Sequence, residues 1–142
     1  LIAHLITSAL PKVFPDLLAH IGVGDNKIRK KIFNKFSYLK FPTIIHPSST
    51  ISNDVTIDDG SFVGSSVSII NGSQIGKHVI LNTASSIDHD TKISDHCYIS
   101  PSVTICGSVK IGRETFIGAK SCLVDNTVVK KKSIIKALSL VK

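Results

Sequence analysis

The sequence predicts a mainly β protein: a left-handed parallel β-helix of about five coils, preceded by part of a small α/β subdomain. Two columns of residues carry this prediction. An aliphatic residue recurs every six positions from Ile45 to Ile135 without a break, and a small or β-branched residue follows four positions after each one, from Ser49 to Ser133. Amphipathic helices repeat near about 3.6 residues and ordinary strands near about 2, so neither keeps a strict period of six.

A coil with three flat faces of six residues each explains both columns. The aliphatic residue points inward and stacks on its equivalent one coil later, and the second column lies near a corner, where only a small side chain fits. Such short strands pair in parallel with the next coil at about 4.8 Å. Hexapeptide repeats are typical of this solenoid, and its left-handed form is an exception to the right-handed crossover rule. Its open ends and flat faces need partners, and homotrimerisation is the usual remedy.

Residues 1–44 lack the period, and we interpret them as the remainder of an α/β subdomain, with the β-helix domain at 45–142. Residues 10–20 are predicted to form a short helix, and residues 20–26 the end of a strand and a turn. A second helix is predicted to begin with Asp25 or Asn26 as its N-cap. Its apolar stripe would consist of Ile28, Ile32, Phe33 and Phe36.

Composition narrows the function classes. The formal charge is +7, with 17 Lys and Arg against 10 Asp and Glu, which suits phosphate-bearing ligands or an anionic surface. The basic runs contain few aromatic residues and no nucleic-acid motif, so nucleic-acid binding is not expected. No apolar run approaches the roughly 20 residues of a membrane span. Three cysteines without a CxxC motif favour a reduced, cytoplasmic compartment.

The segment NTASSIDHDTKIS, residues 82–94, carries the main candidate for chemistry. His89 lies between Asp88 and Asp90. An imidazole with a pKa near about 6.5 suits a general base at neutral pH, and a neighbouring carboxylate stabilises the imidazolium that forms. A solvated turn is the alternative interpretation of the same residues.

Three segments together resemble a known family. They are GDNKIRKKI at 24–32, IIHPS at 44–48, and the pattern NT-x4-DHD-x2-I-x-D at 82–95. The chain resembles the bacterial left-handed β-helix sugar O- and N-acyltransferases, which include sialic acid O-acetyltransferases and UDP-4-amino-sugar N-acetyltransferases of surface glycan biosynthesis. The resemblance implies a cytoplasmic homotrimer that transfers an acetyl group from acetyl-CoA to a nucleotide-activated amino sugar or a sialic acid. It also implies that His89 is the general base and that Asp90 raises its basicity.

The resemblance further implies where the two substrates bind, with no metal expected. Acetyl-CoA would contact Tyr98, where the family has a histidine, then Ala119 after Gly118, and Ala137, where glycine is commoner. The acceptor would lie near Gly24, Asp25 and Asn26, with Asn82 helping to place it.

Part of the family pattern is missing, and other functions stay open. Family members begin with a GxGGHG-type turn for the nucleotide phosphates, which does not occur here, so we expect a truncated chain that lacks roughly 35 residues at its start by the family's spacing. One alternative is therefore a truncated, inactive acyltransferase or a non-catalytic trimeric scaffold. Another is a carbonic-anhydrase-like metal enzyme, which needs three converging histidines. His78 and His96 are 18 residues apart and would stack, but His89 occupies a different position in the six-residue repeat, so it would not lie beside them.

Overall fold

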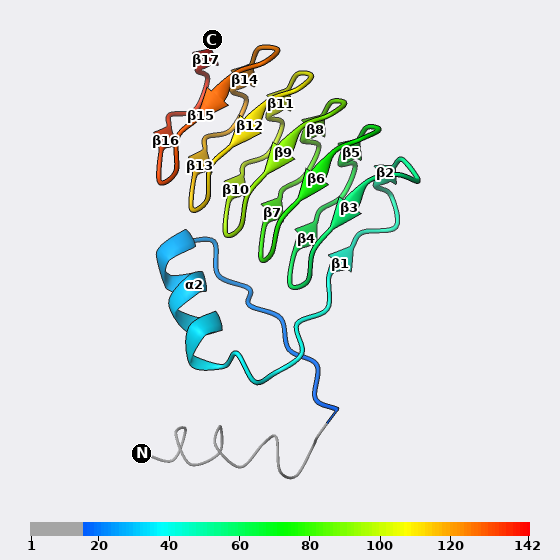
Figure 1. The fold of residues 1–142 in the computed structure, drawn as a ribbon, viewed down its shortest axis with the longest axis vertical. Helices are drawn as coiled ribbons and strands as arrows, with labels where there is room; N and C mark the ends of the chain where they lie inside the picture. The colour runs from blue at the N-terminus through cyan, green and yellow to red at the C-terminus, as the bar shows by residue number, and fades with distance from the viewer. Residues whose placement is uncertain (1–15) are drawn as a thin grey trace.

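The computed structural model describes residues 16–142 and confirms a mainly β parallel solenoid of hexapeptide repeats. Within these residues there are seventeen two-residue strands and one helix, α2 (Asn26–Lys35). The coils stack in one direction from β1 to β17, and α2 lies against one side of the stack (Figure 1). The described residues contain no helix that is long and apolar enough to cross a membrane.

The strands form three parallel sheets, one on each side of a triangular prism. Sheet 1 contains β1 (Ile44–Ile45), β4 (Phe62–Val63), β7 (Ile80–Leu81), β10 (Tyr98–Ile99), β13 (Phe116–Ile117) and β16 (Ile134–Ile135). Sheet 2 contains β2 (Thr50–Ile51), β5 (Ser68–Ile69), β8 (Ser86–Ile87), β11 (Thr104–Ile105), β14 (Cys122–Leu123) and β17 (Leu140–Val141). Sheet 3 contains β3 (Thr56–Ile57), β6 (Gln74–Ile75), β9 (Lys92–Ile93), β12 (Lys110–Ile111) and β15 (Val128–Val129).

The predicted aliphatic column forms the core. Each of its members from Val63 to Val129 is at most 6% exposed, and each pairs in register with its equivalent 18 residues away. Burial of these side chains is the main favourable term in the stability of the solenoid. Ile45 is 48% exposed because it belongs to the first coil and has no coil above it.

The small-residue column does more than fit the corners. Five of its hydroxyl groups donate to a carbonyl of the next coil, 15 residues on, among them Ser61 to Gly76 (2.8 Å), Ser73 to Asp88 (2.9 Å) and Thr115 to Lys130 (3.1 Å). Cys97, predicted as a small inward residue, is fully buried, and its Sγ lies 3.2 Å from the carbonyl oxygen of Gly112. Buried polar atoms need such partners, so size and hydrogen bonding together select this column.

Three corners connect the sheets, and each is a four-residue turn. The first corner joins sheet 1 to sheet 2 (residues 82–85 in one coil), the second joins sheet 2 to sheet 3 (88–91), and the third returns to sheet 1 (94–97). From residue 60 to residue 138, the third residue of every corner has a positive φ, between 53° and 74°. From His78 onwards its amide donates to a carbonyl of the preceding coil, as Asp90 does to Asn71 (2.9 Å).

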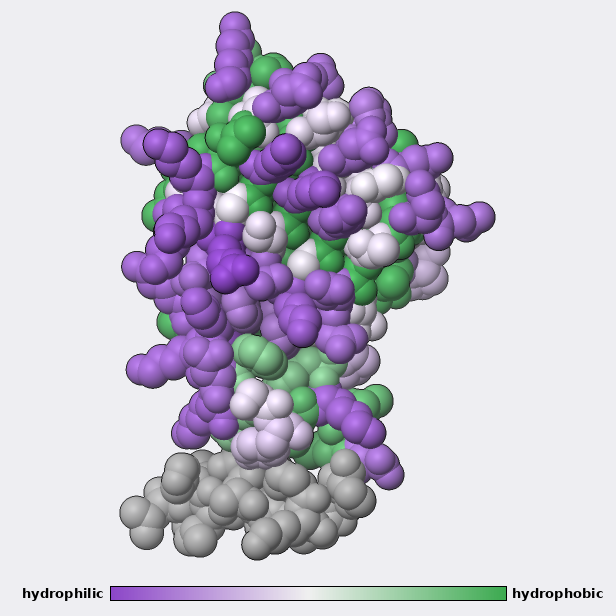
Figure 2. Space-filling view, viewed as in Figure 1, coloured by the Kyte–Doolittle hydropathy of each residue, from purple (hydrophilic) through white to green (hydrophobic). Residues whose placement is uncertain are grey.

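The outward faces of the sheets differ in character. The outward residues of sheet 1 are apolar or aromatic: Ile44, Phe62, Ile80, Tyr98, Phe116 and Ile134. Those of sheet 3 are mostly polar: Thr56, Gln74, Lys92, Lys110 and Val128. Hydrophilic side chains predominate on the face of the molecule that Figure 2 presents. Sheet 1 is therefore the face with most apolar surface to cover.

The segment before the solenoid differs in part from its prediction. Asp25 is the N-cap of α2, and its carboxylate accepts from the amide of Ile28. Ile28 is 52% exposed rather than part of the apolar stripe, and the buried helical residue is Arg29. The strand end expected at 20–26 is absent, since residues 20–25 form neither strand nor bridge and α2 begins at Asn26. A single parallel bridge, between Leu18 and Lys40, lies just before this segment. The helix expected at 10–20 lies mostly outside the described residues, and residues 16–20 are not helical.

Candidate functional site

His89 and Asp90 lie on the second corner and contact each other. His89 Nδ1 is 2.9 Å from Asp90 Oδ2, and the His89 amide donates to Asp88 Oδ1 (2.8 Å). The two side chains are 54% and 67% exposed. Because a carboxylate only accepts hydrogen bonds, Nδ1 carries the proton in this pair. The lone pair of the neutral imidazole is therefore on Nε2, the ring nitrogen that does not face Asp90.

Two glycines make room for this pair. A Cβ on Gly107, one coil after His89, would lie 2.5 Å from His89 Nε2 and 2.6 Å from Cε1. A Cβ on Gly72, one coil before Asp90, would lie 2.5 Å from Asp90 Oδ1. Any side chain at either position would displace the imidazole or the carboxylate. The site is thus held between the backbones of its two neighbouring coils.

The electrostatics of this corner favour a protonated imidazole. The hydrogen bond to Asp90 raises the pKa of His89 most, and the charges of Asp88, Asp90 and Asp125 act in the same direction. Asp125 is held one coil beyond Gly107, whose amide donates to its Oδ1 (2.8 Å). The arrangement therefore increases the basicity of His89, as a general base requires.

Asn82 and Tyr98 form a second pair, beside sheet 1. Asn82 Nδ2 donates to the Tyr98 hydroxyl (2.8 Å), while Asn82 Oδ1 accepts from the amide of Thr83. The Tyr98 ring stacks on Phe116, with ring centroids 5.4 Å apart and planes at 24°. A Cβ on Gly24 would lie 3.3 Å from Tyr98 Cε2. Since the phenol oxygen already accepts from Asn82, its O–H is free to donate to a ligand.

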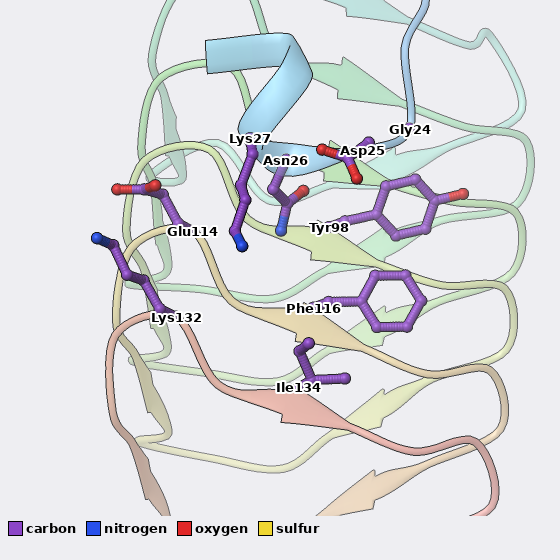
Figure 3. A pocket seen from close by; sticks show the side chains of 9 residues that line it. All are labelled: Gly24, Asp25, Asn26, Lys27, Tyr98, Glu114, Phe116, Lys132 and Ile134. Atoms are coloured by element: carbon purple, nitrogen blue, oxygen red, sulfur yellow. The ribbon is translucent and has the colours of Figure 1, made fainter. Parts of the chain in front are cut away.

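A cavity of about 590 Å³ lies over this part of sheet 1. In Figure 3, Tyr98, Phe116 and Ile134 extend side by side from successive strands along it. The other lining residues are Gly24, Asp25, Asn26 and Lys27 at the start of α2, and Glu114 and Lys132 on the third corner. A smaller cavity of about 290 Å³ shares Gly24 and Tyr98 with it and includes Asn82. The charged lining residues, Asp25, Lys27, Glu114 and Lys132, all belong to the larger cavity.

The residues expected to contact acetyl-CoA lie along the same side of the solenoid. Gly118 and Ala119 are on the first corner, and Ala137 is one coil further on. A Cβ on Gly118 would lie 2.4 Å from the amide nitrogen of Ala137, so the two backbones touch. This corner adjoins sheet 1 and Tyr98. His89 and Asp90, in contrast, lie on the second corner, across sheet 2. Within one chain, the residues predicted to bind acetyl-CoA and those predicted to bind the acceptor therefore lie on or beside sheet 1, while the predicted base lies on another corner.

The histidines required for a metal enzyme do not converge. His78 and His96 stack as predicted, with centroids 5.3 Å apart and planes at 4°. Both are buried on the third corner, under Phe33 of α2, while His89 is exposed on the second corner. Within residues 16–142, no group of three or more His, Cys, Asp or Glu residues could hold a metal ion.

Sequence reasoning did not identify several residues of the cavity. Phe116 and Ile134 follow Tyr98 at intervals of 18. That interval is one coil, so the same repeat that predicted the core also predicts that these residues stack beside Tyr98. The contacts by which Arg29 holds the start of α2 on the solenoid were not predicted either, although Arg29 belongs to the 24–32 segment that resembles the family.

Comparison with known proteins agrees with the fold. The family model "Bacterial transferase hexapeptide (six repeats)" matches residues 90–125. UDP-N-acetylbacillosamine N-acetyltransferase of Bacillus subtilis (strain 168) is 36% identical over 56 residues, which are 38% of this chain and 26% of that protein.

Two solved structures match almost the whole chain. PerB from Caulobacter crescentus, in complex with CoA and GDP-perosamine, is 26% identical with a TM-score of 0.93, over 97% of this chain and 67% of that one. The acetyltransferase domain of PglB from Neisseria gonorrhoeae FA1090, in complex with acetyl coenzyme A, is 30% identical with a TM-score of 0.86, over 95% of this chain and 69% of that one. Matches to other structures of these two proteins cover 66% and 61% of the solved chains, so this chain spans about two thirds of their length. The repeat, the solenoid and the identity to the Neisseria domain together show that the chain belongs to the hexapeptide-repeat acetyltransferase family.

Proposed function

We propose that the protein transfers an acetyl group from acetyl-CoA to the amino group of a nucleotide-linked amino sugar, with His89 as general base. The observation that carries the proposal is the His89–Asp90 pair, in which Nδ1 is engaged at 2.9 Å and the exposed imidazole presents Nε2. The relatives support the substrate class. PerB is solved with CoA and GDP-perosamine, and the Bacillus relative is a UDP-N-acetylbacillosamine N-acetyltransferase.

The chemistry needs one proton transfer at His89. The sugar amine attacks the thioester carbonyl of acetyl-CoA, and the C–S bond breaks as the new C–N bond forms. His89 Nε2 takes the proton that the nitrogen loses, and CoA leaves as its thiolate, which is then protonated. Asp90 holds the Nδ1 proton and stabilises the imidazolium. No covalent enzyme intermediate is required.

The Asn82–Tyr98 pair is suited to the acetyl carbonyl. Asn82 Nδ2 donates to the Tyr98 phenol oxygen at 2.8 Å, so the Tyr98 O–H can donate its own hydrogen to a ligand. In this proposal the O–H stabilises the oxygen that becomes negative during attack. Gly118, Ala119 and Ala137 then provide close backbone approach along the pantetheine. The turn at Gly24–Asn26 contacts the acceptor.

We further propose that the active enzyme is a homotrimer in which the second corner of one copy faces sheet 1 of the next. Within one chain, His89 is separated from Tyr98 and Asn82 by a sheet of the prism, so a single copy does not assemble all three groups. The apolar outward face of sheet 1, where Ile44 is 41% and Ile134 is 76% exposed, has the character of a surface that a partner covers. A second copy supplies the missing base and covers that face.

Acceptors of the sialic acid type, with a hydroxyl nucleophile, are the second candidate within this mechanism, because the same base serves either atom. A scaffold without catalysis is the remaining alternative. It predicts a stable trimer that does not bind acetyl-CoA.

The first experiment is calorimetric titration of the assembled protein with acetyl-CoA, after its mass in solution has been measured by light scattering. We expect micromolar binding that CoA displaces and a mass of three chains. Transfer is then measured by mass spectrometry with GDP- and UDP-linked amino sugars and with a sialic acid. Absence of binding by a folded trimer would exclude the acetyltransferase and leave the scaffold.

A pair of histidine variants tests the base. His89→Gln should reduce turnover by at least about 100-fold, the lower range for loss of a general base, with acetyl-CoA binding and melting temperature unchanged. His46→Gln removes another exposed histidine, on the first corner, and should keep turnover within about twofold, as expected of a surface change. Equal turnover in both variants would remove His89 from the mechanism.

A further inference from the structure

Arg29 is a buried cation whose hydrogen bonds, within residues 16–142, all go to uncharged acceptors. It is 1% exposed and is among the largest fully buried side chains of the described residues. Its N–H groups donate to five backbone carbonyls and one amide oxygen, and no carboxylate is among these acceptors. Burial is the main reason that its pKa falls below the ordinary value for arginine, to about 10. A guanidinium in this position is solvated by the protein alone.

The acceptors of Arg29 belong to two separate parts of the fold. One set lies in the segment before and at the start of α2: Val23 O (3.1 Å), Gly24 O (3.0 Å) and Asn26 Oδ1 (2.7 Å). The other set lies on the third corner of two successive coils: His78 O (3.1 Å), His96 O (3.0 Å) and Cys97 O (3.1 Å). The planar, rigid donor fork of arginine fixes both distance and direction between the two parts.

The two parts meet at the proposed binding region. Cys97 directly precedes Tyr98, and Gly24 is the residue that faces the Tyr98 ring, where an added Cβ would lie 3.3 Å from Cε2. Asn26 also donates through Nδ2 to Thr115 O (2.9 Å). Arg29 therefore holds both sides of the Gly24–Tyr98 contact, and Tyr98 in turn accepts from Asn82.

Attachment of the helix does not by itself require a buried charge. Phe33 already packs against the third corner, with its ring centroid 4.2 Å from that of His78, and Lys30 pairs with Glu114 at 2.6 Å. Replacing a buried ionic group by apolar residues is often neutral or stabilising. The specific effect of Arg29 is to hold the Gly24–Asn26 turn in one position relative to Tyr98.

We propose that Arg29 is a positioning residue that sets the gap between the Gly24–Asn26 turn and Tyr98, and thereby aligns the acceptor with the acyl donor. The inference rests on the proposed function for its kinetic consequence. Its structural half, that Arg29 controls the surroundings of Tyr98, does not depend on activity. The two halves are tested separately.

The chain offers a direct probe of Tyr98, because it contains two tyrosines and no tryptophan. In a Tyr38→Phe background, all tyrosine emission comes from Tyr98. Arg29→Lys should at least double the acrylamide quenching constant of that emission, whereas Lys31→Met, which removes an exposed cation from the same helix, should leave it unchanged. Equal quenching in Arg29→Lys and the parent protein would overturn the proposal, whether or not the protein is an acetyltransferase.

The kinetic arm separates positioning from general stability. Arg29→Lys should raise KM for the acceptor or for acetyl-CoA at least tenfold at a temperature where circular dichroism shows the solenoid intact. Gly24→Ala should change the same constant in the same direction, because its Cβ presses on Tyr98 without touching Arg29. A loss of melting temperature with both KM values unchanged, or a Gly24→Ala variant with parental kinetics, would make Arg29 structural only. If the parent protein has no transferase activity, the proposed function fails and the quenching result stands by itself. Should Arg29→Lys not fold, Arg29→Gln replaces it in both measurements.

Discussion

Lowering the pH should destabilise the junction between α2 and the solenoid, because a buried histidine pair there resists protonation. His78 is 2% exposed. Its ring stacks on His96 at 5.3 Å and lies 4.2 Å from the ring of Phe33 and 5.2 Å from that of Phe41. Within the described residues, Nδ1 of neither histidine has a hydrogen-bond partner. A proton added to either ring would therefore create a charge without solvation.

The size of the effect follows from the pKa of His78. Burial lowers this pKa from 6.5 to about 4, with further lowering by His96, Arg29 and His20 and an opposing effect of Asp59. Below about pH 6.5 the unfolded chain takes up a proton that the folded chain refuses until about pH 4. Stability is therefore full above pH 6.5 and is lost as the pH falls towards 4. The loss reaches about 2 kcal/mol at pH 5 and about 3 kcal/mol below pH 4.

Urea unfolding between pH 7.5 and pH 4.5, at constant protein concentration, measures this loss. His78→Asn removes the titrating ring, and asparagine tolerates the positive φ of 53° at this position. The variant should lose some stability at pH 7.5 and should lack about 2 kcal/mol of the further decline by pH 5. His46→Asn, at an exposed position, is the control. A wild-type free energy of unfolding that changes by less than about 0.5 kcal/mol from pH 7.5 to pH 5 would refute the reasoning.

Three further predictions concern the site and the core. Gly107→Ala places a Cβ 2.5 Å from His89 Nε2, so turnover should fall at least tenfold with acetyl-CoA affinity retained in calorimetry; a parental rate would show that the imidazole does not need this position. Burial raises the pKa of Cys97 to about 12, so iodoacetamide at pH 8 should leave Cys97 unmodified in peptide mass spectra until the protein is unfolded, and rapid labelling of native protein would contradict its burial. Ile99, 0% exposed in the middle of the stack, should cost about 2–5 kcal/mol when changed to alanine, as measured by urea unfolding, and a cost below about 1 kcal/mol would mean that the coils repack around the gap.

The local sequence predicted the solenoid because every coil has the same packing requirements. An inward aliphatic residue must stack on its equivalent, and a small residue must fit the corner, so a period of six is visible without any long-range information. The corner position of His89 and Asp90 follows from the same count. The ends were less predictable. Ile45 belongs to the same column, but exposure depends on whether a further coil lies above it.

The helix shows why pattern reasoning failed at Arg29. Helical spacing and hydropathy assign Ile28 to the buried stripe, yet Ile28 is 52% exposed and Arg29 is 1% exposed. The surface under α2 is not a uniform apolar face. It presents backbone carbonyls of two coils at the third corner, such as those of His78 and His96. A donor-rich side chain satisfies these carbonyls better than an aliphatic one, and no property of the helix sequence by itself reveals them.

The sequence by itself determined the repeat, the inward columns, the corner that carries His89 and Asp90, and the N-cap region of α2, because each depends on residues one coil or less apart. Only the tertiary structure decided that Asn82 contacts Tyr98 and that Gly24 faces the same ring. Those relations depend on how the coils wind and how the segment before them folds back across sheet 1. The physical reason is that the six-residue period determines whether a side chain points into the core or outward. Contacts between side chains on different faces depend instead on the three-dimensional packing of the chain.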